Sequence, residues 1–385
     1  MKINEINIYK LLLPFSTEFT HSLRKRNSVN NIIVEVIASQ GEAIGYGEGA
    51  PRSYVTSETQ ESAANGIEDL LEKYKFPWKL NNITQIWDFI DSMPEDEKNY
   101  NSAICALEMA LLNTLAEREN MPIVEYFPHD FYVDTINYGA VIPFGNRKKQ
   151  TRICQLIREI GFKTIKLKIG KDLEQNRIAL KTIAMILEYG YDLKVDINGV
   201  WDYEIASEHI PMLREYNTKV VEQPMAPDNP RIAEFARIIK EDDILLMADE
   251  SACSLEDVKR IAKDGHYNMI NIRLSKCGGF RKSLKLIDYL RNKGIPFQIG
   301  CQLGESGLLS AAGRALSLLC GDAVYYDGSY DTFLLKENIT FDNVSFGQGG
   351  KAGLLKGPGL GVKVNKQKLN RLSDLSSKIT IRRPD

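Results

Sequence analysis

The sequence predicts an α/β fold: a TIM-type (β/α) barrel with an N-terminal α+β capping domain that the C-terminal tail completes. From about residue 134, eight short apolar runs alternate with helical segments, which is the pattern of successive parallel β/α units. Charged residues at the ends of such runs recur every 26 to 28 positions. That spacing is about the length of one β/α unit, so these charges should return to one end of the barrel. They are Lys168, Asp196, Glu222, Asp249 and Lys276.

The composition is that of a soluble globular protein with a sizeable core. The chain has 385 residues, of which 43% are hydrophobic and 26% charged, and its formal net charge is −2. This balance argues against a nucleic-acid-binding surface, and the short basic run 24–26 does not change it. The cysteines form no Cys-x-x-Cys pair, and there is no signal-peptide layout and no apolar run of about 18 residues. We therefore expect a cytoplasmic protein with reduced thiols, no membrane segment and a small-molecule substrate.

The front of the chain predicts the sheet of the capping domain. A polar stretch, 16–30, contains His21 and Arg24, and a second loop, 49–56, contains Tyr54. A loop as long as the first is usually either functional or disordered, and these three side chains are candidates to bind substrate; simple solvent exposure is the alternative for each. The β-rich runs that should pair as a meander are 6–13, 31–38 and 43–48.

Three helices should follow the meander within a capping domain that we assign to residues 1–125. The Ser-Glu-Thr-Gln sequence at 57–60 predicts a capping box before the first helix. The second helix should cover 83–90. The third, 101–118, is apolar on most faces and should be buried.

The barrel domain is assigned to residues 126–335. Helical segments such as 174–188 and 280–292 separate its strands. The remaining residues, 336–385, include a glycine-rich loop, and we expect them to pack back on the capping domain. The expected barrel strands are 136–142, 164–168, 193–197, 219–222, 244–248, 268–273, 296–300 and 323–326.

Asp196, Glu222 and Asp249 end the third, fourth and fifth of these strands. The C-terminal strand ends form the reactive face of such a barrel, and three adjacent carboxylates repel one another unless a cation neutralises them. An all-oxygen set without nearby Cys or His suits Mg²⁺, with Mn²⁺ as the next choice. Asn198 and Glu250 follow two of the carboxylates and should orient them. One acidic residue at a strand end is more simply solvated, but three in even succession favour a metal site.

Two groups of lysines flank the three carboxylates. Lys166 and Lys168 point the same way on the second strand, because strand side chains alternate. Lys168 is the expected proton carrier, and Lys166 should lower its pKa and neutralise a substrate oxygen. We place Lys276 on the sixth strand, across the barrel axis. Opposed lysines suit removal of an α-proton from one face of a metal-bound carboxylate and its return on the other, with the metal stabilising the enediolate.

Five motifs in this order resemble the enolase superfamily, specifically the muconate-cycloisomerase (muconate lactonizing enzyme) subgroup. The resemblance extends over nearly the whole chain. It implies Mg²⁺ on the three carboxylates, Lys168 and Lys276 as the acid/base pair, and a homo-oligomer. The motifs are Lys166-x-Lys168, Asp196-x-Asn198, Glu222-Gln223-Pro224, Ala248-Asp249-Glu250-Ser251 and the run 271–279 that includes Lys276.

Substrate recognition is expected beyond the seventh and eighth strands. Dipeptide epimerases of this subgroup resemble one another in an Asp-x-Asp that grips the substrate's ammonium group, and here the place reads Asp327-Gly-Ser329. We expect Asp327 and Ser329 to bind substrate, with ammonium recognition weakened by the loss of one aspartate. Glu305 matches a carboxylate that family members place near the second lysine; a charge favourable to a helix N-terminus is the alternative.

The sequence thus favours a Mg²⁺-dependent racemase or epimerase of an amino-acid derivative such as a dipeptide. The same residues would serve a cycloisomerase of the muconate-lactonizing type or a dehydratase of the o-succinylbenzoate-synthase type. A Schiff-base aldolase, which also uses a strand lysine, is a further alternative. A barrel that binds a metal-chelated ligand without turnover is the alternative outside enzymology.

Overall fold

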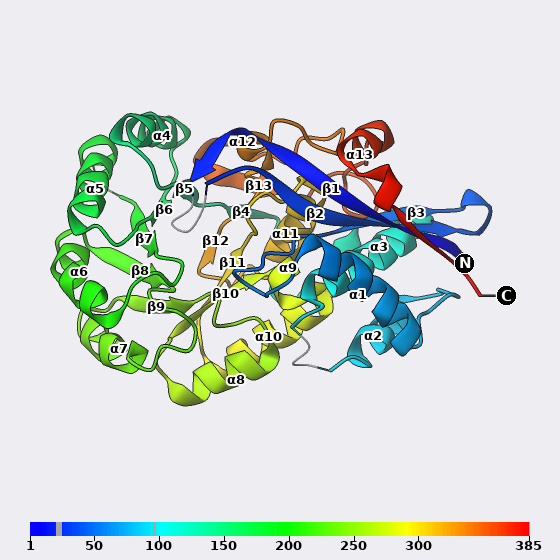
Figure 1. Cartoon of the computed structure of the whole chain (residues 1–385), viewed down its shortest axis with the longest axis horizontal. Helices are drawn as coiled ribbons and strands as arrows, with labels where there is room; N and C mark the ends of the chain where they lie inside the picture. The colour runs from blue at the N-terminus through cyan, green and yellow to red at the C-terminus, as the bar shows by residue number, and fades with distance from the viewer. Residues whose placement is uncertain (21–24, 95–97, 189, 385) are drawn as a thin grey trace.

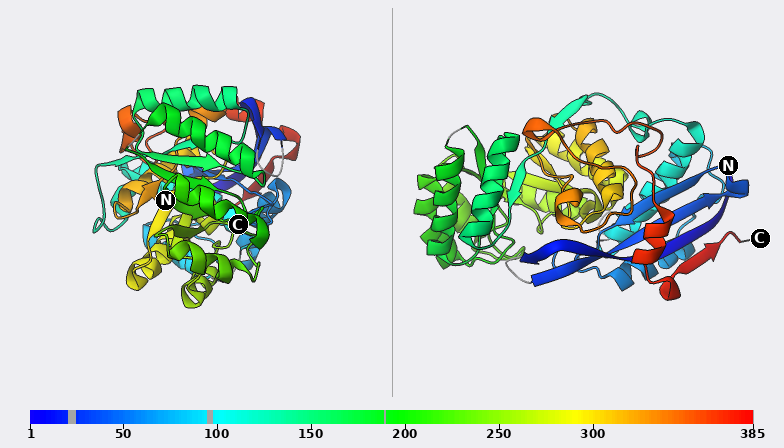
Figure 2. Two further views of the ribbon diagram at one scale, coloured as in Figure 1. Left: turned by 90° about the vertical axis from the view of Figure 1, so that its left-hand side faces the viewer. Right: turned by 90° about the horizontal axis from the view of Figure 1, so that it is seen from above.

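A capping domain and a barrel lie side by side in the computed structural model, which describes residues 1–20, 25–94, 98–188 and 190–384 (Figure 1). The predicted α/β class, a barrel with an antiparallel cap, is confirmed. Both termini lie at the end of the cap that is remote from the barrel (Figures 1 and 2). Within the described ranges, no helix has the length and apolarity needed to cross a bilayer.

The cap is built on a four-stranded antiparallel sheet. The first strand pairs on one side with the last strand of the chain, so the tail closes the sheet edge. The predicted polar loop at 16–30 is wrong, because most of it pairs as a long hairpin through Phe19↔Arg26 and Thr20↔Lys25. Phe15 is buried and anchors this hairpin, whose Phe and Thr residues favour strand. The strands, in sheet order, are β14 (Ile379–Arg382), β1 (Ile3–Thr20), β2 (Lys25–Ala38) and β3 (Ile44–Gly49).

Glycines on β3 let the sheet approach the central helix of the cap closely. A Cβ on Gly45 would lie 2.2 Å from Thr114 Oγ1, and one on Gly47 only 2.0 Å from the carbonyl oxygen of Ala106. The central helix is buried along most of its length, as predicted. The cap helices are α1 (Gln60–Lys73), α2 (Ile83–Asp91) and α3 (Asn101–Glu119), followed by the 3₁₀ turn η2 (Ile123–Tyr126); another, η1 (Ser39–Gly41), precedes β3.

The capping box before α1 lies two residues later than predicted. Thr59 is the N-cap, and it exchanges hydrogen bonds with Ser62. Glu58 is instead buried and accepts a hydrogen bond from the backbone N–H of Ser102, which ties the start of α1 to α3.

Eight parallel strands form the barrel sheet. The predicted strand 136–142 is split: β4 (Thr135–Asn137) leaves the barrel to pair with β13 (Lys351–Gly353). The amide of Gly139 donates to the carbonyl of Tyr326 (2.7 Å), which links the first and last barrel strands. The barrel strands are β5 (Ala140–Ile142), β6 (Thr164–Lys168), β7 (Asp192–Asp196), β8 (Thr218–Glu222), β9 (Leu245–Ala248), β10 (Met269–Arg273), β11 (Phe297–Gly300) and β12 (Tyr325–Tyr326).

Helices surround the barrel sheet and the tail crosses to the cap (Figure 2). Their apolar faces pack on the strands, which leaves the C-terminal strand ends open toward the β1–β2 hairpin. The helices are α4 (Arg147–Ile160), α5 (Leu173–Leu187), α6 (Tyr203–Glu215), α7 (Ile232–Lys240), α8 (Leu255–Asp264), α9 (Leu274–Cys277), α10 (Gly279–Lys293), α11 (Gly307–Leu319), α12 (Asp331–Leu334) and α13 (Lys366–Leu372), with the 3₁₀ turns η3 (Gln348–Gly350) and η4 (Leu375–Ser377) in the tail.

Candidate active site

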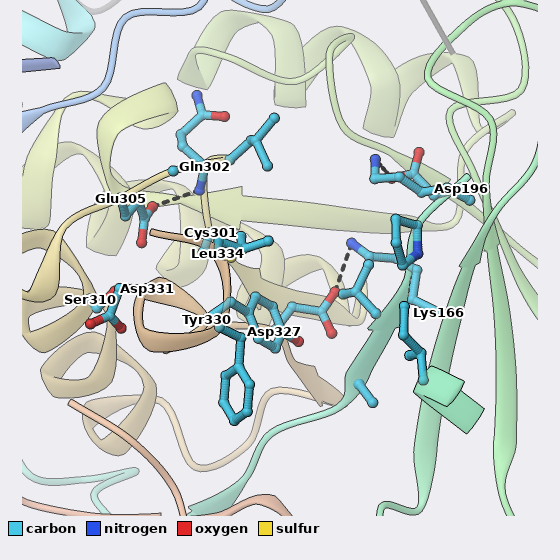
Figure 3. Close-up of a pocket in the computed structure, with 18 of the residues that line it drawn as sticks. Lys166, Asp196, Cys301, Gln302, Glu305, Ser310, Asp327, Tyr330, Asp331 and Leu334 are labelled. Carbon is cyan, nitrogen blue, oxygen red and sulfur yellow. Dashed lines mark hydrogen bonds and ion pairs between the residues drawn. The ribbon is translucent and has the colours of Figure 1, made fainter. Parts of the chain in front are cut away.

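A cavity of about 380 Å³ opens where the barrel strands end. Its polar wall comes from residues at or just after the ends of β6, β7, β10, β11 and β12, and the cap contributes Phe15 and Tyr54. Figure 3 shows Lys166, Asp196 and Asp327 around this cavity. Tyr54 therefore lies where the sequence predicts it, whereas His21 and Arg24 fall outside the described residues. The polar wall includes Lys166, Lys168, Asp196, Asn198, Arg273, Gln302, Glu305 and Asp327.

The three predicted carboxylate ligands end consecutive strands. Asp196 and Glu222 are the last residues of β7 and β8 and are register partners, and Asp249 directly follows β9. All three are buried. Burial raises the pKa of Glu222, whereas Lys168 and Lys166 outweigh burial at Asp196 and hold its pKa below the ordinary value. Neighbouring cations are therefore what keeps this carboxylate charged.

Lys168 and Lys166 project from β6 toward different carboxylates. The Lys168 ammonium lies 2.8 Å from Asp196 Oδ2 and donates to Asn198 Oδ1 at 2.9 Å. The Lys166 ammonium lies 2.8 Å from Asp327 Oδ2 and 3.2 Å from Glu222 Oε2. Lys168 thus stands beside the expected metal ligands, and Lys166 bridges them to the eighth strand.

Asp327 is neutralised from two sides. Besides Lys166, the fully buried Lys194 of β7 places its ammonium 3.0 Å from Asp327 Oδ1. Although burial opposes ionisation, these two lysines lower the pKa of Asp327 to about 2. Lys194 escaped the sequence analysis because it reads as an ordinary strand residue two positions before Asp196. Ser329 is buried, accepts a hydrogen bond from Arg314 and does not line the cavity.

Arg273, rather than Lys276, is the residue of the sixth strand that lines the cavity. Its guanidinium contacts Asp249 and donates to Glu222 Oε1 at 3.2 Å. The placement of Lys276 on the strand is wrong: β10 ends at Arg273, and Lys276 lies on the short helix α9. Lys276 is fully buried and donates to the carbonyl and carboxylate oxygens of Asp249 at 2.8 and 3.0 Å.

The two-residue period of a strand could have identified Arg273. It shares a face with Asn271, which donates to Glu222 Oε1 at 2.8 Å, whereas Lys276 is out of phase with both. Burial opposes the charge on Arg273, but Asp249 and Glu222 outweigh burial and raise its pKa well above the ordinary value. A guanidinium of this kind stays protonated and cannot remove a proton near neutral pH.

The three carboxylates are of the type that binds Mg²⁺, although their side chains do not form a metal-binding cluster in this structure. Within the described residues, no three His, Cys, Asp or Glu side chains are close enough together to hold an ion. The guanidinium of Arg273 forms ion pairs with two of the three carboxylates, Glu222 and Asp249. The buried oxygens of Asp196, Glu222 and Asp249 are hard ligands without competing sulfur or imidazole, which is the chemistry that Mg²⁺ prefers.

Two further carboxyl groups lie near the site with raised pKa values. Glu250 accepts from Asn198 Nδ2 at 3.2 Å, and burial, followed by the charge of Asp249, raises its pKa to about 8. Glu305 accepts from the backbone N–H of Gln302 at 2.6 Å, and burial raises its pKa to about 8 as well (Figure 3). Both can therefore hold a proton near neutral pH.

Comparison with known proteins matches residues 150–368 to the family described as enolase C-terminal domain-like. The hydrophobic dipeptide epimerase of Enterococcus faecalis is 27% identical over 81% of this chain and 86% of its own. The N-succinyl-L-Arg/Lys racemase of Bacillus cereus is 25% identical over 97% of this chain and 98% of its own. A dipeptide epimerase from Cytophaga hutchinsonii, solved with Mg and D-Ala-L-Val, has a TM-score of 0.84 at 24% identity, covering 99% of this chain and all of that one.

Proposed function

Since the chain belongs to the enolase superfamily and is an isomerase, we propose that it removes the proton α to a carboxylate with the help of Mg²⁺. The substrate is an amino-acid derivative such as a dipeptide, and the reaction is its racemisation or epimerisation. Asp196, Glu222 and Asp249 would hold the metal, whose charge stabilises the enediolate formed when the proton leaves. The observation that carries the proposal is the ion pair between Lys168 and Asp196 in the wall of one cavity.

Lys168 is the group that we assign to proton removal. Its contacts with Asp196 and Asn198 fix the position of its nitrogen at the cavity wall, and such positioning of a base is a large part of its catalytic effect. Lys166 neutralises charge on a substrate oxygen. Asn198 donates a hydrogen bond to Glu250 beside the proposed metal ligands, and Tyr54 covers the substrate from the cap.

Lys276 is the group that we assign to proton return. Burial opposes its charge, but Asp249 outweighs burial and raises its pKa, so it stands protonated as an acid. Lys276 does not line the cavity, because its ammonium donates two hydrogen bonds to Asp249. It can return a proton to the substrate only when these hydrogen bonds break.

The position of Arg273 favours a second candidate reaction. If Lys168 is the only base that reaches the α-carbon, proton removal is followed by elimination or ring closure rather than by inversion. Cycloisomerases and dehydrating synthases need only one such base. The guanidinium of Arg273 would then bind a second oxygen of the substrate from the opposite wall.

Proton exchange in D₂O tests the proposal. Incubation with Mg²⁺ and a pool of dipeptides and N-acylamino acids should place deuterium at one α-carbon, detected by mass spectrometry. Absence of exchange across the pool, with metal binding shown separately, would contradict the racemase and shift the assignment to a dicarboxylic acid that loses water or cyclises.

The stereochemistry of exchange separates the two candidates. With two acting lysines, wild-type enzyme gives deuterated product of both configurations, and Lys276→Met retains exchange of one enantiomer but no longer inverts it. Deuterium with complete retention in the wild-type enzyme would identify Lys168 as the single base. Chiral chromatography of the exchanged substrate measures the outcome.

A further inference from the structure

We propose that the active-site cavity has an apolar arm that binds the hydrocarbon chain of an N-acyl group on the substrate. The arm runs between α4 and the segment 330–346. The inference rests on the proposed function, which assigns the reacting end of the substrate. We define this α4 arm by two walls. The residues that line it are Ile153, Leu156, Ile157 and Ile160 of α4 and, opposite them, Phe162, Phe333, Leu334 and Phe346.

The α4 wall is a continuous apolar stripe. Ile153, Leu156, Ile157 and Ile160 follow the three- and four-residue spacing that places side chains on one face of a helix. Ile157 is buried, whereas Leu156 remains 42% exposed. A helix face that packs fully on its own barrel would not leave a leucine exposed along a cavity, so this stripe has surface to offer a ligand.

The opposite wall is aromatic. Phe333 stacks on Phe346 with ring centroids 5.5 Å apart, and Phe162 meets Phe346 edge-on at 5.3 Å. Phe333 is nevertheless 47% exposed. Stacked rings present a flat, pre-formed apolar surface, which binds methylene groups with little loss of conformational entropy.

The arm is continuous with the catalytic site, which argues for a part of the substrate as its occupant. One cavity includes both walls of the arm together with Lys166, Lys168 and Asp327. Where the arm meets the site, the Lys166–Asp327 ion pair offers a donor and an acceptor (Figure 3). These groups suit the C=O and N–H of an amide, so the amide-linked substituent is the one that enters the arm.

The charges at this junction favour an uncharged acyl group over one that carries an ammonium. The negative charge of Asp327 is shared by Lys166 and Lys194. The other carboxylate on this side of the cavity, Asp331 of α12, is buried and accepts a hydrogen bond from Asn338 at 2.6 Å. On α4 itself, the charged residue that lines the cavity is Lys149, again a cation. An N-acyl chain of several methylenes fits both the walls and the charge.

Chain length is the variable that tests the arm. N-acyl-L-alanines with acyl chains of two, four, six and eight carbons are compared by α-deuterium exchange with Mg²⁺, and their binding is measured by titration calorimetry. A buried methylene is worth up to about fourfold in binding, so kcat/KM and affinity should rise severalfold with each two-carbon step. N-hexanoyl-L-alanine should also exceed L-norleucyl-L-alanine, which differs from it only by an ammonium group.

Leu156→Gln is the matched variant, because Leu156 is exposed and its loss does not threaten the core. It should lower the ratio of kcat/KM for the octanoyl substrate to kcat/KM for the acetyl substrate about tenfold. Met185→Gln is the control, since Met185 is 64% exposed on the neighbouring helix α5 and does not line the cavity. It should leave the ratio at the wild-type value.

The outcomes separate this inference from the proposed function. Exchange that is equally fast for all chain lengths would overturn the arm and leave the proposed function standing. Affinity that rises with chain length without any exchange would support the arm and overturn the function. If Leu156→Gln changes the sedimentation of the protein but not the chain-length dependence, the face is a contact between copies of the chain and the inference is wrong.

Discussion

Asp327 shows how neighbouring charges set what a buried carboxylate can bind. A lone carboxylate at this position would attract an ammonium group. With Lys166 and Lys194 both within about 3 Å, its charge is already balanced. The sequence shows Asp327 but not the partner Lys194, since residues that are 133 positions apart meet only through the closure of the barrel. Asp327 is therefore better understood as a residue that holds Lys166 in place than as one that binds a substrate cation.

Removal of the proposed base should abolish proton exchange without unfolding the protein. Lys168→Ala should lower the rate of α-deuterium exchange by at least about a hundredfold, the usual effect of losing a general base. Because the loss of Lys168 leaves the buried Asp196 with Lys166 as its main neighbouring cation, the thermal unfolding midpoint should fall, but the variant should still fold. Lys171→Ala, at an exposed position shortly after β6, is the control and should keep full activity. Exchange by Lys168→Ala near the wild-type rate would contradict the assignment.

Glu305 makes stability depend on pH in a defined direction. Burial raises its pKa from 4.5 to about 8, so the folded protein binds one more proton than the unfolded chain between these values. Its stabilising contribution is therefore fully present below pH 4.5 and is lost as the pH rises toward 8. Glu305→Gln keeps an acceptor for the Gln302 amide and should flatten this decline.

Urea unfolding at several pH values between about 5 and 9 measures the effect. Glu72→Gln, on the exposed face of α1, should leave the wild-type decline unchanged. An identical pH dependence in Glu305→Gln and wild type would show that Glu305 has an ordinary pKa.

At the scale of elements, the contact between β3 and α3 is a close fit of backbone against backbone. Gly47→Ala would place a Cβ 2.0 Å from a backbone oxygen, which cannot move aside as a side chain can. We expect a loss of about 3 kcal/mol or more in the free energy of unfolding, as for overpacked cores. Gly313→Ala is the control: it lies within helix α11, has no atom within 4 Å of the added Cβ, and should stabilise the protein by up to about 1 kcal/mol. Equal stability of Gly47→Ala and wild type, measured by chemical denaturation, would disprove the close contact.

Elements were predictable where one pattern dominates and not where two compete. The buried helix α3 and most barrel strands follow directly from apolar periodicity. The β1–β2 hairpin was missed because Ser, Glu and Asn at 16–30 suggest a loop, whereas pairing with the adjacent strand outweighs their low strand propensity. The strand 136–142 was overextended because its residues serve two different sheets on either side of Gly139.

At the scale of the whole molecule, metal binding should be coupled to stability. The three carboxylates come from three different strands, so an ion that they share ties the barrel together. Mg²⁺ at a hundredfold excess over its Kd should raise the free energy of unfolding by about 2.7 kcal/mol. Thermal unfolding with and without a chelator measures this, and Asp196→Asn should abolish the Mg²⁺-dependent part. A chelator without effect on wild type would contradict the metal site.

The sequence predicted which side chains of β6, β7 and β8 meet at one end of the barrel, but it did not predict the shape of the cavity. Even spacing along the chain places Lys168, Asp196 and Glu222 at one end of the barrel, because each β/α unit returns the chain to the same face. Spacing, together with the family resemblance, also selected Lys276 over Arg273, since a turn of α9 after the strand cannot be read from residue counts. The α4 arm was invisible to the sequence because its two walls, α4 and Phe346, are nearly 200 positions apart.

The joint between β5 and β12 has a mechanical consequence. The other neighbouring barrel strands are paired through parallel ladders, but the ring is completed across this joint by the Gly139–Tyr326 backbone hydrogen bond. A closed ring deforms first at its weakest seam, and β5 carries the chain directly into α4. Strain imposed on the barrel wall is therefore expected to open this seam before it breaks the strand ladders elsewhere in the ring.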